Sequence, residues 1–168
     1  MNTPCYVIGS LLFCLSLPSA ASADEFGAFV KVNVPKIAKA IEKADANFFD
    51  AITTPDFTET TGGRVVRKAR ALVEMRLEFN MMKSASCKID LLSAKSVGTS
   101  GTSLTHIKMS SVTKPGKDGK SHSMAIESWG QQTWVKKGTT WKLKSIVETK
   151  EPRMWLDGIE VGAPKAAK

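Results

Sequence analysis

Cysteine is scarce in this sequence, and the few cysteines present cannot build a disulfide framework. Of the three cysteines in 168 residues, Cys5 and Cys14 lie in an uncharged N-terminal stretch. Removal of that stretch on export would leave only Cys87, so no intramolecular disulfide could form. Cys87 stands in an alternating apolar run, where a small buried residue is the expected role.

No apolar stretch is long enough to cross a membrane, and the first 23 residues carry no charged side chain. The apolar run over residues 6–17 has about 12 residues, whereas a spanning helix needs about 20. Small residues ending in Ala21-Ser22-Ala23 follow this run, directly before Asp24. The pattern predicts a secretory signal peptide over residues 1–23, cleaved after Ala23. We therefore expect a periplasmic or secreted protein without stable membrane insertion.

Composition leaves room for one globular domain. Hydrophobic residues make up 42%, charged residues 24% and aromatic residues only 7% of the chain, values typical of an ordinary folded domain. A chain of this size can bury one core. We expect an N-terminal extension over residues 24–33, a domain over residues 34–150, and a tail over residues 151–168 whose residues 155–161 could form a short hairpin.

Two amphipathic helices are predicted in the first half of the mature chain. The first opens near Pro35 and ends before Pro55, because proline suits a first helical turn and stops a preceding helix. The second covers about residues 66–84, after a Gly62-Gly63 turn. Their apolar faces carry Ile37, Ile41, Ala44, Phe48 and Ile52 in the first helix and Leu72, Met75, Phe79 and Met82 in the second.

Four strands follow, at about residues 87–97, 102–113, 121–136 and 139–149, and their short Gly-containing connections predict antiparallel hairpins. A turn at Lys137-Gly138 would set Trp134 opposite Trp141 and Gln132 opposite Leu143. Gly130 lies in mid-strand, where a bulge or bend is expected. Alternation then places Ile107, Met109, His122, Met124, Ile126, Ser128, Gln132, Trp134, Trp141 and Leu143 on an inner face, and His106, Trp129, Gln131, Thr133 and Val135 on the outer face.

The last hairpin carries a family resemblance. Its sequence TWVKKGTTWKL, over residues 133–143, resembles the SnoaL-like branch of the nuclear transport factor 2-like (NTF2-like) superfamily, and Gly62-Gly63-Arg64-Val65 resembles the turn before the second helix in those proteins. The resemblance covers about residues 34–150. It implies a cystatin/NTF2-like cone of the α+β class, with a strongly curved four- to five-stranded antiparallel sheet wrapped around the N-terminal helices. It also implies a pocket between sheet and helices, and members often form homodimers through the sheet.

The family resemblance does not define an activity, because this fold hosts isomerases, cyclases, dehydratases and plain binding domains. Ketosteroid isomerase and its relatives use a pocket carboxylate as base and a tyrosine that stabilises the enolate oxygen. The only tyrosine here, Tyr6, lies in the predicted signal peptide. No carboxylate is predicted on the inner face, since Asp50 and Asp56 near the end of the first helix are expected to cap it or to be solvated. Gln132 occupies a position that many family members give to Asp.

The sequence gives little support for a catalytic histidine or a metal site. His122 could act as a general base, but its place beside the Asp118-Gly119 turn favours a solvated hairpin-end residue. One cysteine and two separated histidines, His106 and His122, provide no ligand cluster with metal-site spacing. We therefore expect neither a metal nor another cofactor.

Two function hypotheses follow. The first is an exported binding or association domain whose apolar pocket takes a small apolar or carbonyl-bearing molecule; the alternative is an isomerase-, cyclase- or hydrolase-like enzyme that uses His122 or a pocket carboxylate. The amide of Gln132, in an apolar setting, needs a hydrogen-bond partner: Ser128, Ser145, water or the ligand. The candidate ligand-binding residues are Met109, Met124, Ile126, Ser128, Gln132, Trp134 and Leu143.

Positive charge is in excess, with a net charge of +8. It gathers at the start of the second helix, in Arg64, Arg67, Lys68 and Arg70, and at a hairpin tip, in Lys114, Lys117 and Lys120. A solvated surface is the ordinary explanation, and an anionic ligand or envelope surface is an alternative. No aromatic residues are interleaved with these charges, so we do not expect a nucleic-acid partner.

Overall fold

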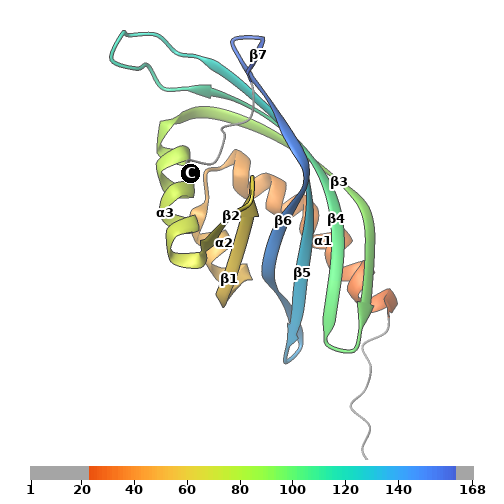
Figure 1. Cartoon of the computed structure of the whole chain (residues 1–168). Helices are drawn as coiled ribbons and strands as arrows, with labels where there is room; N and C mark the ends of the chain where they lie inside the picture. Colours follow the sequence, from red (N-terminus) through yellow and green to blue (C-terminus); the bar gives the residue numbers. More distant parts are fainter. Residues whose placement is uncertain (1–22, 162–168) are drawn as a thin grey trace, which may run out of the picture.

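The computed structural model describes residues 23–161, in which one long, curved sheet wraps around helices (Figure 1). None of the helices in these residues is long and apolar enough to cross a membrane. The expected α+β cone is confirmed, while the predicted signal peptide up to Ser22 lies outside the described residues. The helices are α1 (Ala23–Glu42), α2 (Ala46–Ile52) and α3 (Lys68–Met81), and the strands are β1 (Thr53–Thr61), β2 (Arg64–Arg67), β3 (Met82–Val97), β4 (Ser100–Thr113), β5 (Ser123–Lys137), β6 (Thr140–Leu156) and β7 (Ile159–Val161).

The sheet has the strand order β2-β1-β6-β5-β4-β3, and β7 pairs with the end of β6. The four strands predicted in the second half are all present, and the short hairpin expected around residues 155–161 is formed by β6 and β7. Strands β1 and β2 form a hairpin through Gly62-Gly63 that was not predicted from the sequence. The expectation of a purely antiparallel sheet is wrong, because β1 pairs with β6 in parallel.

Helix α1 begins at Ala23, so the predicted start near Pro35 is wrong. Phe26, Val30 and Val34 form a stripe at steps of four and are buried, which extends the apolar face towards the N-terminus. Pro35 is tolerated inside the helix because the carbonyl left without a donor is that of Lys31, and both residues lie on the exposed side. Residues 24–33, expected as an extension, form the first half of α1.

The predicted first helix is in fact two helices, separated by a turn. Ala44, expected on the apolar face, is exposed and has a positive φ of 53°. Asp45 then caps α2, because its carboxylate accepts hydrogen bonds from the backbone N–H groups of Asn47 and Phe48, both at 3.1 Å. A side-chain acceptor at this position satisfies N–H groups that a helix start leaves without partners.

The second predicted helix is shorter than expected at both ends. Residues 64–67 form β2, and α3 covers only Lys68–Met81 before the chain enters β3 at Met82. Val66, expected as the first helical residue, is instead buried in β2 opposite Glu59. Pairing with β1 therefore overrides the helical pattern at this boundary.

The predicted inner face is confirmed for Gln132, Trp134, Trp141 and Leu143, but the predicted register of the β5–β6 hairpin is wrong. Trp134 lies opposite Leu143, and Trp141 lies opposite Lys136, because the turn starts after Lys137. Next to the turn the shift is two residues, which keeps every side chain on its predicted face. Beyond an irregularity between Thr133 and Trp134 the shift is three residues: Gln132 lies opposite Ile146, and Ser145, expected beside Gln132, lies opposite Thr133 of the outer face. Trp134 and Trp141 are thus diagonal neighbours, and the bend expected near Gly130 is present as a register shift between β5 and β6.

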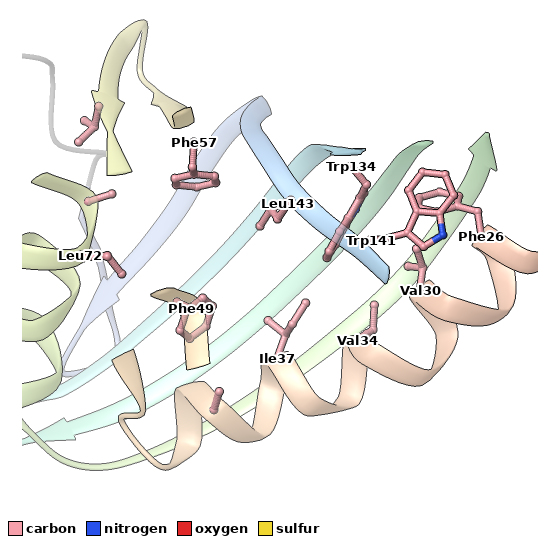
Figure 2. Packing of buried hydrophobic residues seen from close by; sticks show 13 residues of the cluster. Phe26, Val30, Val34, Ile37, Phe49, Phe57, Leu72, Trp134, Trp141 and Leu143 are labelled. Atoms are coloured by element: carbon pink, nitrogen blue, oxygen red, sulfur yellow. The ribbon is translucent and has the colours of Figure 1, made fainter. Parts of the chain in front are cut away.

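The core lies between α1 and the inner face of the sheet (Figure 2). The ring centroids of Phe26 and Trp141 are 4.7 Å apart. Gly101 of β4 lies directly against the Phe26 ring: a Cβ at this position would be 2.5 Å from a ring carbon. The expected burial of Cys87 is confirmed. The buried apolar cluster comprises Phe26, Val30, Val34, Ile37, Ala40, Phe49, Phe57, Val66, Ala71, Leu72, Trp134, Trp141 and Leu143.

Candidate functional site

The inner face of the sheet divides into two halves at Gly130. The closed half contains three of the predicted ligand-binding residues, Gln132, Trp134 and Leu143, which are at most 4% exposed. Trp134 also contacts the ring of Phe29 on α1, with centroids 5.5 Å apart. In this conformation these three side chains belong to the packed core under α1.

The amide of Gln132 has hydrogen-bond partners on β4. Its Oε1 accepts a hydrogen bond from the Ser103 hydroxyl at 3.0 Å, and its Nε2 approaches the Thr105 hydroxyl at 3.5 Å. Ser103 in turn accepts a hydrogen bond from the indole N–H of Trp134 at 3.0 Å. Ser103 and Thr105 have no exposed surface. This chain of polar groups fixes the closed half, and its partners are neither Ser128 nor Ser145.

The open half of the inner face contains the other four predicted ligand-binding residues. Ser128 and Ile126 continue the same face of β5, and Met109 and Met124 lie beside them on β4 and β5. All four side chains are half-buried, so solvent reaches them although the row is mostly apolar. Such partly exposed apolar surface beside polar groups is typical of small-molecule sites.

A carboxylate that the sequence analysis missed, Glu59, lies on this inner face. The register pairs Glu59 of β1 with Ile146 of β6, and Ile146 with Gln132 of β5. Directly paired residues share a face, so Glu59 points to the same side as Gln132. Glu148, two residues after Ile146, lies beside it and accepts a hydrogen bond from the Gly62 N–H at 3.1 Å.

The surroundings of Glu59 favour its protonated form. Burial and the neighbouring carboxylates of Glu78, Glu74 and Glu148 raise the pKa of Glu59 above its ordinary value of 4.5, while Arg64 acts in the opposite direction. A half-buried carboxyl group with a raised pKa keeps its proton to a higher pH than an exposed one and can act as an acid or a base. A signal for it was present in the sequence, because alternation from the apolar Phe57 puts Glu59 on the same face.

His122 lies at the end of the β4–β5 hairpin, as expected, and is joined there to the β6–β7 turn. Its Nδ1 is 2.6 Å from the Asp157 carboxylate, which also accepts a hydrogen bond from the Ser123 N–H at 2.8 Å. The hydrogen bond and charge of Asp157 raise the pKa of His122 above 6.5. This geometry ties two hairpins together and places His122 away from Glu59.

The outer face carries a different set of side chains. Trp129 and His106 stack with centroids 4.6 Å apart and rings 6° from parallel, which confirms their predicted place on this face. His106 Nε2 is 2.7 Å from the Glu127 carboxylate, and the Lys150 ammonium lies 4.9 Å from the Trp129 ring centroid. These contacts make the centre of the outer face a rigid, mixed aromatic and charged surface.

A trough of about 460 Å³ crosses the outer face near the strand ends. Its floor is a row of small residues, because Ser86, Ser110 and Ala125 lie opposite one another on β3, β4 and β5. Trp155 of β6 ends this row, and the guanidinium of Arg153 lies 4.9 Å from its ring centroid. Met124 is the one predicted ligand-binding residue that also lines this trough.

Comparison with solved structures identifies the fold. A scytalone dehydratase-like protein from Novosphingobium aromaticivorans superposes with a TM-score of 0.65 at 10% identity, over 84% of this chain and 93% of that one. A hexachlorocyclohexane dehydrochlorinase (LinA) superposes with a TM-score of 0.61 at 10% identity over the same shares. An NTF2-like superfamily protein from Salmonella enterica gives 0.56 at 12% identity, over 84% and 95%. The chain therefore has the NTF2-like fold.

At the level of sequence, neither a family model nor a curated protein matches this chain. Identities of 10–12% show the fold alone, and activity has to be argued from the site. The inner face carries half-exposed apolar side chains on β4 and β5 and the half-buried carboxyl groups of Glu59 and Glu148 on β1 and β6. Chemically, the apolar row can hold an apolar molecule, and a carboxyl group such as that of Glu59 can exchange a proton.

Proposed function

We propose that the chain is an exported domain of the NTF2-like fold that binds a small apolar or carbonyl-bearing molecule on the open half of its inner face. The supporting observation is the row of Met109, Met124 and Ile126, whose side chains are apolar and partly exposed. Ser128 lies in the same row, and its hydroxyl can donate a hydrogen bond to a carbonyl oxygen. The buried residues of the closed half, Gln132 among them, then form the rigid base of the site.

The test uses prodan, a fluorescent apolar ketone, as the probe. Met109→Gln should weaken prodan binding by about tenfold, because a polar amide replaces apolar contact surface in the row. Lys108→Gln is the matched control: it is the preceding residue of β4, points to the opposite face, and receives the same new side chain. Equal effects of the two substitutions, or no binding by the parent protein, would exclude this site.

A second candidate function, acid–base catalysis, is favoured by Glu59. Burial and neighbouring carboxylates raise the pKa of Glu59, and carboxyl groups with raised pKa values are common among catalytic acids and bases. Nitrobenzisoxazole, whose ring opens when a base removes a proton from carbon, reports on such a group without knowledge of the natural substrate. The rate should increase as the pH passes a value above 4.5, Glu59→Gln should abolish it, and the exposed control Glu151→Gln should leave it unchanged. Loss of the reaction in both variants, or in neither, would remove Glu59 as the base.

Export remains part of the proposal, supported by the uncharged apolar run that ends at Ala23. Cleavage there would leave the mature chain beginning at Asp24, close to the start of α1. Intact-mass measurement of protein from its own host should give the mass of residues 24–168. The mass of the full chain would refute the predicted cleavage.

We also propose a homodimer that forms through the outer face of the sheet. Trp129 is half-buried there, and Val147, on the same face of β6 opposite Gln131, is 39% exposed. Native mass spectrometry should show the mass of two chains, and Val147→Glu should shift it to one chain. A monomer for the parent protein would contradict this proposal.

A further inference from the structure

The exposed side of α3 carries a stripe of large apolar side chains. Val73, Leu77 and Met81 follow at steps of four and are 54%, 59% and 59% exposed. The opposite side of the same helix is also apolar, since Leu72 is buried and Phe79 packs against the core. A helix that is apolar on two sides normally has both sides covered. Here the described residues cover only one.

A shallow groove runs along this stripe. It has a volume of about 480 Å³ and is lined by Ala69, Arg70, Val73, Glu74 and Leu77. We call the surface formed by Val73, Leu77 and Met81 together with this groove the α3 outer face. Exposed apolar patches of this kind commonly mark an interaction surface.

Positive charge surrounds the α3 outer face. Residues 64–83 contain six Lys or Arg residues and two Glu residues, a net charge of +4, which is half of the +8 of the whole chain. Within this segment Glu74 pairs with Arg64 and Arg70, at 2.6 and 2.7 Å. Arg76 and Lys83 form no ion pair with any residue in the described part of the chain. Asp50 lies nearby, where it pairs with Lys68 at 2.8 Å and has its pKa lowered in part by the charge of Arg76. Since Arg76 and Lys83 have no ion-pair partner at contact distance among the described residues, they are cations of this segment that can meet an anionic partner.

A further group of cations lies at the C-terminal end of α3. The backbone N–H of Lys114 donates a hydrogen bond to the carbonyl oxygen of Met81 at 2.7 Å. This contact brings the β4–β5 connection, which also contains Lys117 and Lys120, next to the last turn of the helix. The apolar stripe thus has cationic side chains along it and at its end.

Charge and shape together favour one occupant. In a symmetric dimer the α3 outer face would meet its own copy, and the positive charges would repel each other. A nucleic acid would need aromatic platforms for its bases, whereas the exposed side chains are Val, Leu and Met. We propose that the α3 outer face binds the surface of an anionic lipid bilayer, with Val73, Leu77 and Met81 among the headgroups and the cations on the lipid phosphates. Apolar side chains at the level of the headgroups and nearby cations that attract anionic lipids both strengthen binding to a bilayer surface.

The experiment measures co-sedimentation of the full purified chain with lipid vesicles. Binding to equimolar phosphatidylglycerol and phosphatidylcholine should exceed binding to pure phosphatidylcholine by about tenfold or more, because each nearby cation adds to the attraction. Raising the salt concentration to about 0.5 M should remove most of this difference by screening. Equal binding to both vesicles, or none, would overturn the proposal.

Two glutamate variants locate the binding surface. Leu77→Glu should decrease binding to the anionic vesicles by about tenfold. Val97→Glu is the matched control, because Val97 is 86% exposed at the far end of β3 and the substitution adds the same charge. Equal loss of vesicle binding in both variants would mean that binding depends only on the net charge of the protein, and it would refute a binding site on α3.

Arg76→Gln removes one cation and should weaken binding to the anionic vesicles without placing a charge in the apolar stripe. A dimer mass that disappears only with Leu77→Glu would assign this face to a second copy and overturn the lipid proposal.

Discussion

The contact between Gly101 and the Phe26 ring allows a quantitative prediction about the core. A Cβ at position 101 would lie 2.5, 2.6 and 2.8 Å from three carbons of the ring, whereas carbon atoms pack at about 3.5–4.0 Å. The ring would have to move by about 1 Å. It cannot do so freely, because Trp141 lies against it with centroids 4.7 Å apart and Phe26 has no exposed surface.

Gly101→Ala should therefore destabilise the fold by about 1 to 3 kcal/mol, the usual range for overpacking a core. Gly130→Ala is a matched control, since Gly130 is buried in the adjacent strand but its added Cβ would meet the nearest atom at an ordinary 3.5 Å. That variant should be close to neutral, because a less flexible unfolded chain offsets small losses by about 0.4 to 1 kcal/mol.

The assay is urea denaturation followed by tryptophan fluorescence. In addition to the two alanine variants, Phe26→Leu should be measured alone and combined with Gly101→Ala. Because the smaller side chain vacates the space next to position 101, the double variant should cost less than the sum of the single ones, with a coupling of about 1 kcal/mol or more. Equal stability of Gly101→Ala and Gly130→Ala, or strict additivity with Phe26→Leu, would refute the packing described here.

Three further predictions concern other side chains. Trp134→Ala should cost about 3 to 5 kcal/mol in unfolding free energy because the ring is buried, and Trp129→Ala should cost clearly less; similar losses would mean that the two faces are exchanged. Gln132→Leu should cost about 1 to 3 kcal/mol, because it leaves a buried hydroxyl without its acceptor; unchanged urea stability would contradict the network. Because its pKa is raised in the folded state, His122 should contribute stability that is present below pH 6.5 and lost as the pH passes its folded pKa. His122→Gln should flatten that part of the pH profile, and an unchanged profile would exclude the role of Asp157.

Local sequence signals were sufficient for the long strands but not for the elements that depend on distant partners. Glycine turns and alternation gave the hairpins from β3 to β6 and their inner and outer faces. The predicted register of β5 and β6 is wrong by two residues next to the turn and by three beyond Trp134. Alternation reports neither which residues form the turn around Gly138 nor where a strand carries an irregularity. The faces of Trp134, Trp141 and Leu143 are unaffected, since only an odd shift exchanges them. Beyond the irregularity at Trp134 the shift becomes odd, and Ser145 lies on the outer face instead of beside Gln132.

The N-terminal half shows where local reasoning fails. Local rules predict helix boundaries at Pro35 and Pro55, whereas tertiary packing of Phe26 and Val30 extends α1 to the N-terminal side of the first proline. The second did mark the change to strand, but β1 exists because it pairs in parallel with β6, a partner far along the chain. Since β1 was not predicted, neither was its inner-face carboxyl group, Glu59.

Of the candidate site, the sequence predicted which residues share the inner face but not which of them are open to solvent. Helix α1 shields three of them, Gln132, Trp134 and Leu143, from solvent. The position of α1 depends on Phe26 and Val30, which lie in the segment predicted to be an N-terminal extension. The polar partners of Gln132 on β4, Ser103 and Thr105, follow from strand pairing rather than from any pattern within β5.

The position of Phe26 in the first turn of α1 has a consequence for the time course of folding. Its partner Trp141 is in the last long strand, and the neighbouring ion pair between Glu25 and Lys136, at 2.7 Å, joins residues 111 positions apart. Contacts of such long range form slowly, because the entropy of closing a large loop must be overcome before they contribute. The core cannot be completed until almost the entire chain has been synthesised. For a protein proposed to cross a membrane through the secretory route, this delay keeps the chain unfolded during the period in which it must still be threaded.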